Sequence, residues 1–300
     1  MTAIIIDLRR AVRHLPRLYL AAGALVGIYL FVTWWPAVEE PAIKESYASP
    51  VYKGGREMPL FYVKTKEKKV AFTFDISWGS KTAPLVLDIL KQHNLQATFF
   101  LSGFWAKKHP ELVKRIVEDG HEIASHGDEH VNLSQYSPAD IAANLTTAHR
   151  DLKEATGAEA RYFRPPNGDY DDDVVRTARE LNYETVIWSL DSLDWKNPGA
   201  DYMVNLVVRE AYPGDIILMH ASDSSRQIHL ALPGIIKGLR DRGFEILNLS
   251  QLLAAGRPGR DDPRGRPREE RDTREIRQPA AVNPEDLISR PPRTPRLNRN

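Results

Sequence analysis

The stretch VAFTFDISWG, residues 70–79, is a short run of alternating side chains that ends on a carboxylate. Val70, Phe72 and Phe74 alternate with smaller residues, which is the period-two pattern of a β-strand. The pattern stops at Asp75, and a turn-type sequence follows. A carboxylate at the last residue of such a strand is expected at a sheet edge where loops build a site.

Strand-type and helix-type segments alternate from this stretch to about residue 253, giving seven β/α units. The strand-type segments read VAFTFD, ATFFL, HEIAS, RYFR, TVIWSL, DIILM and FEILNL. Helices are expected over 82–93, 110–118, 138–156, 171–181, 200–211, 231–242 and 250–254. This alternation predicts an α/β fold with a parallel sheet, either open and doubly wound or closed into a barrel. Periodicity alone does not separate the two arrangements.

The bulk composition excludes several classes of function. The 300 residues carry a net charge of +1, which provides no basic field for nucleic acid. The absence of cysteine excludes disulfides, thiolate metal sites and a cysteine nucleophile. With 42% hydrophobic residues, the chain is long enough for one large domain or two small ones.

The N-terminal region contains an uncharged apolar segment over residues 18–35. As a helix it would be about 27 Å long, close to the thickness of the bilayer core. Arginines 9, 10, 13 and 17 precede it and glutamates 39 and 40 follow it, so the positive-inside rule directs the N-terminus to the cytoplasm. We expect a single-pass anchor in the cell membrane with the globular domain extracytoplasmic. A cleaved signal peptide is the alternative.

Shifts in composition divide the chain into five regions. They are a cytoplasmic N-terminus (1–17), a transmembrane anchor (18–36), a linker (37–68), a globular domain (69–255) and a disordered tail (256–300). The linker contains an apolar patch at 60–63, which is expected to contribute one short strand.

Polar side chains stand at or just after the ends of five predicted strands. These residues are Asp75, His126 with His130 close behind it, Arg164, Asp191 and His220. Any one of them has an ordinary structural explanation, such as a helix cap or a surface ion pair. Because the carboxyl ends of parallel strands meet at one edge of the sheet, the five positions are expected to converge on a site.

The convergent residues suit hydrolysis assisted by a metal ion. His126 and His130, four residues apart, can hold a divalent ion that polarises a carbonyl group and its bound water. Asp75 would accept the proton of that water and His220 would protonate the leaving group.

Three further residues are expected to support this chemistry. Asp191 can orient His220 and favour its charged form. Arg164 is expected to pair with Asp75 and keep it ionised at neutral pH. Backbone N–H groups of the turn around Asn167 can stabilise the oxyanion.

The chain from about residue 69 to residue 253 resembles the polysaccharide deacetylases, carbohydrate esterase family 4 with its NodB-homology domain. The family's five motifs occur in order as TFDIS (73–77), SHGDEH (125–130), RPPNG (164–168), DSLDW (191–195) and ILMH (217–220). The resemblance implies a distorted (β/α)7 barrel. It also implies an N-acetylated glycan of N-acetylglucosamine type as substrate, such as peptidoglycan or a related cell-wall polymer, with acetate and a free amine as products.

The resemblance also implies a role for each motif residue. Asp75 matches the catalytic base, and Arg164 matches the arginine that holds it. His126 and His130 match the ligands of a metal ion such as Zn²⁺, and Asn167 matches the position whose backbone stabilises the oxyanion. Asp191 and His220 match the acid pair, and Trp195 and Leu218 match residues that line the substrate groove.

Ile76 is the one departure from the family's motifs. The first motif normally reads TFDD, and its second aspartate is the third metal ligand. Asp75, Asp128 or a water molecule could complete the coordination shell of the metal instead. The sequence TFDISWG is most similar to the sporulation-associated subgroup, which shares the isoleucine. Three interpretations follow: a glycan N-deacetylase, a glycan-binding pseudoenzyme that lost its metal site through Ile76, and a hydrolase of another amide or ester.

Overall fold

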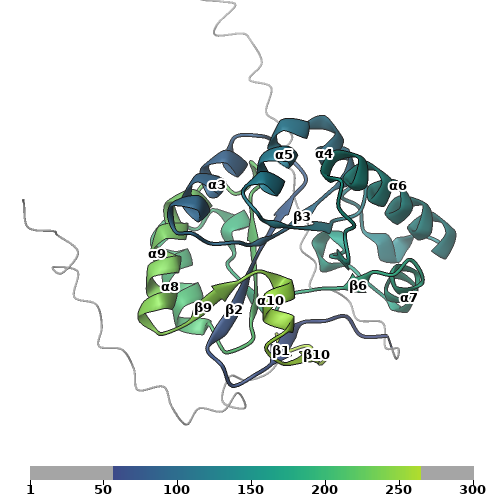
Figure 1. Ribbon diagram of the computed structural model, residues 1–300. Helices are drawn as coiled ribbons and strands as arrows, with labels where there is room; N and C mark the ends of the chain where they lie inside the picture. The colour runs from purple at the N-terminus through teal and green to yellow at the C-terminus, as the bar shows by residue number, and fades with distance from the viewer. Residues whose placement is uncertain (1–56, 265–300) are drawn as a thin grey trace, which may run out of the picture.

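The computed structural model describes residues 57–264, which fold around one parallel sheet (Figure 1). Within this range there is no helix with the length and apolar character that crossing a bilayer requires. The anchor predicted at 18–36 and the tail beyond residue 264 lie outside the described residues, so both stay predictions.

The main sheet follows the order β6-β5-β4-β3-β2-β8-β7, and β9 pairs with the start of β2. All its ladders are parallel. Its strands are β2 (Lys69–Ile76), β3 (Thr98–Leu101), β4 (Glu122–Ser125), β5 (Tyr162–Phe163), β6 (Glu184–Thr185), β7 (Leu190–Asp191), β8 (Ile216–His220) and β9 (Glu245–Leu247). Residues 70–76 of β2 are all buried, as expected for the central strand of a covered parallel sheet.

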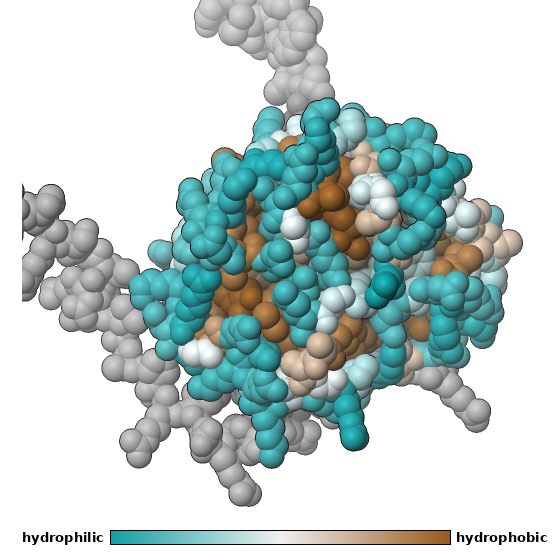
Figure 2. Space-filling view, viewed as in Figure 1, coloured by the Kyte–Doolittle hydropathy of each residue, from teal (hydrophilic) through white to brown (hydrophobic). Residues whose placement is uncertain are grey.

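The helices form an arc around the sheet, from α8 and α9 through α3, α5 and α4 to α6 and α7 (Figure 1). They are α3 (Thr82–Gln92), α4 (Gly103–Lys108), α5 (Pro110–Glu118), α6 (Pro138–Thr156), α7 (Asp172–Glu180), α8 (Ala200–Glu210), α9 (Ile228–Asp241) and α10 (Leu249–Leu253). The short α4 has no counterpart among the predicted helices. Hydrophilic side chains cover most of the face in Figure 2, and hydrophobic ones show between them.

The sheet curls but is not a continuous ring of strands. Within residues 57–264 no ladder joins β6 to β7, the two ends of the strand order. Leu60 pairs with the end of β6: its N–H donates to the carbonyl of Thr185 at 2.8 Å, and its carbonyl accepts from the N–H of Ile187 at 2.8 Å. The predicted parallel α/β fold is therefore confirmed as a curled sheet, while closure by strand pairing is not observed.

The folded unit extends beyond the predicted limits of 69 and 255. Strand β1 (Tyr62–Lys64) pairs antiparallel with β10 (Arg257–Gly259) in a separate two-stranded sheet. Leu60, Phe61 and Val63 are fully buried. Residues assigned from the sequence to the linker and the tail thus belong to the domain.

Candidate active site

The strand ends predicted to converge do meet at one edge of the sheet. In the parallel pairing of β2 with β8, Asp75 lies directly beside His220. Residues paired directly across adjacent strands project to the same face of the sheet, so these two side chains lie side by side, on strands about 4.8 Å apart. His126 follows β4 and Arg164 follows β5.

A buried ion pair holds Asp75. The Nη1 of Arg164 donates to Oδ1 of Asp75 at 2.7 Å, and both residues are buried. Nη2 donates to Oγ1 of Thr73 at 3.0 Å and to the carbonyl of Ile187 at 3.2 Å. Burial lowers the pKa of Arg164, and attraction to Asp75 opposes that effect. Since an arginine stays charged in proteins, the pair fixes one oxygen of Asp75.

The other oxygen of Asp75 faces His126, with Oδ2 3.7 Å from Nε2. The Nδ1 of His126 lies 2.8 Å from the carbonyl oxygen of Arg164. Because a carbonyl oxygen only accepts, Nδ1 carries the proton and the lone pair of Nε2 points toward Asp75. This arrangement of a carbonyl behind the ring is the usual support for a metal-binding histidine.

His130 lies beside His126, with ring centroids 5.2 Å apart. Burial lowers the pKa of both imidazoles, and the proximity of His126 and His220 lowers that of His130 further. Both rings are therefore neutral at pH 7, the form that binds metal ions. The ring of Trp78 covers His130 at 4.4 Å between centroids.

The donor set fits a divalent ion held by two histidines. Across residues 57–264 no three histidine, aspartate or glutamate side chains are placed to hold a metal ion together. Ile76 is fully buried and offers no ligand. Burial, together with the neighbouring carboxylates of Asp151 and Glu129, raises the pKa of Asp128. Water would supply the remaining ligands.

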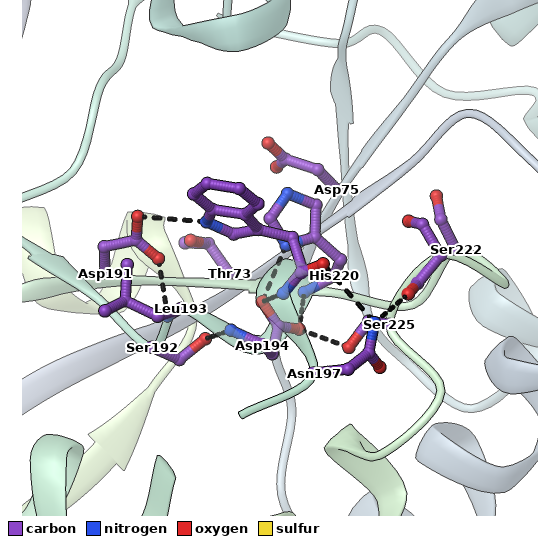
Figure 3. Close-up of polar contacts among 12 residues, drawn as sticks. Thr73, Asp75, Asp191, Ser192, Leu193, Asp194, Asn197, His220, Ser222 and Ser225 are labelled. Atoms are coloured by element: carbon purple, nitrogen blue, oxygen red, sulfur yellow. Dashed lines mark hydrogen bonds and ion pairs between the residues drawn. The ribbon is translucent and has the colours of Figure 1, made fainter. Parts of the chain in front are cut away.

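His220 is held by Asp194 (Figure 3). The Nδ1 of His220 lies 2.8 Å from Oδ1 of Asp194, and the N–H of His220 donates to Oδ2 at 2.7 Å. The hydroxyl of Ser225 also donates to Oδ2, at 2.8 Å. Burial alone would raise the pKa of Asp194, but attraction to His220 and these hydrogen bonds hold it below its ordinary value. Asp194 is therefore a buried carboxylate that orients the imidazole.

The predicted role of Asp191 in orienting His220 stays a prediction, and the charge of His220 acts on Asp191. Asp191 accepts from the N–H of Leu193 at 2.8 Å and from Nε1 of Trp195 at 3.4 Å. Burial raises the pKa of Asp191, while these hydrogen bonds and attraction to His220 oppose that effect. After β7 the backbone turns through Leu193 in the left-handed conformation, with φ 57°, and this turn brings Asp194 to His220.

The remaining predicted residues border the same edge. Asn167 lies in the 3-10 turn Pro166–Gly168 with φ 58°, and its Nδ2 donates to Oδ1 of Asn132 at 2.6 Å. Trp195 is half-buried beside Asp191. Leu218 is fully buried two residues before His220 on β8, and therefore on the same face of the sheet. The roles of these three residues stay predictions.

Besides Asp194, four residues near the site were not predicted from the sequence: Thr73, Trp78, Asn132 and Ser225. Thr73 and Trp78 belong to the stretch around Asp75, and Thr73 shares a strand face with Asp75, so alternation could have pointed to it. Asn132 and Ser225 contact the site through loops, whose paths no periodic pattern reveals.

The site contains Asp75 and His220, each held by a buried partner, with two neutral histidines beside them. This set of groups is typical of an acid–base hydrolase, built here on a curled α/β sheet. The family model of the polysaccharide deacetylases matches residues 62–186. The chain is 38% identical to a peptidoglycan-N-acetylglucosamine deacetylase of Bacillus cereus, over 64% of this chain and 91% of that protein. It is 33% identical to the peptidoglycan-N-acetylmuramic acid deacetylase PdaA of Bacillus subtilis, over 64% and 74%.

Solved structures agree with these relatives. A carbohydrate esterase family 4 pseudoenzyme from Bacillus anthracis superimposes with a TM-score of 0.63 at 34% identity, over 66% of this chain and 70% of that one. Bacillus subtilis PdaA gives a TM-score of 0.62 at 31% identity, over 66% and 86%. The chain therefore belongs to the polysaccharide deacetylases, hydrolases of carbohydrate esterase family 4. It spans 60% of another relative, YlxY of Bacillus subtilis, at 30% identity.

Proposed function

We propose that this protein removes acetyl groups from an N-acetylglucosamine-type cell-wall glycan, peptidoglycan or a related polymer, leaving a free amine on the sugar. The observation that carries the proposal is the pair Asp75 and His220, side by side on adjacent strands. Each has its own buried partner, Arg164 for the carboxylate and Asp194 for the imidazole. One group can therefore accept a proton while its neighbour donates one.

In this proposal a water oxygen attacks the acetamide carbonyl carbon, and Asp75 takes the proton that the water loses. The negative charge moves to the carbonyl oxygen, where N–H groups of the turn around Asn167 would stabilise it. The C–N bond then breaks as His220 gives its proton to the departing amine. Asp194 stabilises the charged imidazole that this step requires. Acetate and the free amino sugar are the products.

We propose Zn²⁺ as the resident metal, with His126 and His130 as its protein ligands. When bound, the ion would polarise the acetamide carbonyl and lower the pKa of a coordinated water. The neutral state of both imidazoles and the carbonyl behind His126 support this assignment. We also propose, from the sequence alone, that residues 18–36 anchor the domain on the outer side of the cell membrane.

A glycan-binding pseudoenzyme is the second candidate. Ile76 is buried where the family places its third metal ligand, and the similar Bacillus anthracis structure is that of a pseudoenzyme. In this case the groove would bind the glycan while the site neither holds metal nor turns over. Asp75 and Arg164 would then keep only their structural ion pair.

The two candidates differ in metal content and acetate release measured on one preparation of the full chain. The substrate is a tetramer of β-1,4-linked N-acetylglucosamine, supplied with Zn²⁺. An enzyme releases acetate, and His220→Ala abolishes the release. A binding protein retains the tetramer but releases no acetate with any divalent ion. Turnover of small acetyl esters without turnover of the tetramer would instead identify a hydrolase of another amide or ester.

A further inference from the structure

The indole of Trp188 connects the site to the C-terminal segment of the domain. Trp188 is 6% exposed and lies in the connection between β6 and β7, where no ladder closes the described sheet. The guanidinium carbon of Arg164 lies 5.8 Å from the centroid of this indole. A Cβ atom added to Gly168 would stand 2.7 Å from the ring. Trp188 thus packs against the arginine that holds Asp75 and against the turn that contains Asn167.

Arg264 is the second arginine on this indole. Its guanidinium carbon lies 5.3 Å from the centroid of the Trp188 ring and 5.0 Å from that of Phe61. Asp262 fixes its orientation, because Nε donates to Oδ1 at 2.8 Å and Nη2 donates to Oδ2 at 2.7 Å. A cation over an aromatic ring contributes about 0.5–2 kcal/mol, the larger value when the pair is desolvated. The Arg264 side chain is only 19% exposed.

The segment that carries Arg264 is firmly joined to the domain. Strand β10 pairs with β1, and Arg260 donates to both carboxylate oxygens of Glu184 at 2.8 Å. The backbone of Trp188 itself lies outside the named strands. Its ring therefore depends on side-chain packing, and Arg264, which also stacks on Phe61, supplies part of that packing.

We propose that Arg264 is a positioning residue for deacetylation. By stacking on Trp188 it holds the indole against Arg164 and against the turn of Asn167, and so fixes the base and the oxyanion donors relative to each other. Small displacements of such groups lower the rate of the chemical step more than they weaken substrate binding. This inference rests on the proposed function of the same site.

The test compares variants of the full chain on the tetramer of N-acetylglucosamine with Zn²⁺. Arg264→Ala is expected to lower kcat about five- to tenfold and to leave KM within about twofold, as the loss of one stacking contact would. Arg264→Lys keeps the charge without the planar group and should be intermediate. Arg260→Ala is the matched control, because it breaks another ion pair of the same segment, and its kcat should stay within about twofold of the wild type.

A second measurement does not depend on turnover. The protein is labelled with 5-fluorotryptophan, and the fluorine resonance of Trp188 is assigned with Trp188→Phe. Arg264→Ala should shift or broaden that resonance, and Arg260→Ala should not.

Unchanged kcat in Arg264→Ala, a rise in KM alone, or equal losses in Arg264→Ala and Arg260→Ala would overturn the proposal. Absence of acetate release from the wild type would refute the proposed function instead. The fluorine resonance would then test the contact between Arg264 and Trp188 without turnover. A shift confined to the Arg264 variants supports that contact, and no shift refutes it.

Discussion

Replacing Asp194 by asparagine is expected to disable the proposed acid while keeping the shape of the site. The carboxylate accepts from Nδ1 and the backbone N–H of His220, from Ser225 and, at 3.0 Å, from the N–H of Trp195. An amide has one accepting oxygen, so its NH₂ group would face two of these four donors. The imidazole of His220 then loses its orientation or takes the wrong tautomer.

The expected loss in kcat for Asp194→Asn is about 100- to 10,000-fold, the range that one general acid or base contributes. Asp191→Asn is the matched control three residues away. Asp191 accepts hydrogen bonds from Leu193 and Trp195, whereas Asp194 is bonded to the imidazole of His220 directly, so the loss in Asp191→Asn should stay below about tenfold, the worth of a single hydrogen bond. The assay is acetate release from saturating N-acetylglucosamine tetramer. A greater loss in Asp191→Asn than in Asp194→Asn would refute the assignment of the acid pair.

Three further predictions concern stability and metal dependence. Asp223 accepts from the N–H groups of residues 80, 81 and 82 at the start of α3. Asp223→Ala should therefore lower the free energy of unfolding by about 1–2 kcal/mol. An unchanged midpoint of urea unfolding would contradict this prediction. Burial lowers the pKa of His121 in the folded protein to about 4, whereas in the unfolded chain it is about 6.5. Between these two values only the unfolded chain binds a proton at His121, so the free energy of unfolding falls as the pH drops from about 6.5 toward 4. His121→Gln should remove about 2 kcal/mol of the stability lost between pH 7 and pH 5, whereas an identical pH slope would exclude His121 as the source. Chelation should lower acetate release, with recovery on adding Zn²⁺ to the wild type but not to His126→Ala; chelator-resistant release would argue against a metal.

The regular β/α alternation made the parallel sheet and its functional edge predictable, because each unit carries its own periodic signal. The short strand expected at 60–63 is present as β1, but its pairing with β10 remained hidden. Its apolar patch is short and flanked by proline, lysine and glutamate, and its partner β10 lies almost 200 residues away. Pairing over such a distance leaves no local pattern, so the first strand was placed in the linker and the second in the C-terminal tail.

The site shows the same division between local and distant information. The strand ends located Asp75, His126, Arg164 and His220, and the expected contact between Arg164 and Asp75 is present. The hydrogen-bonded partner of His220, Asp194, was missed because DSLDW offers two aspartates three residues apart. The choice depends on the left-handed turn at Leu193, which leucine seldom adopts and which composition does not reveal.

The central claim is that Asp75 activates water for attack on an N-acetyl group. Its most direct test is acetate release by Asp75→Asn beside the wild type, with binding of the N-acetylglucosamine tetramer measured on both proteins. The account predicts acetate from the wild type, a fall of about 100- to 10,000-fold in the variant, and similar binding by both. Equal acetate release from the two proteins would contradict it.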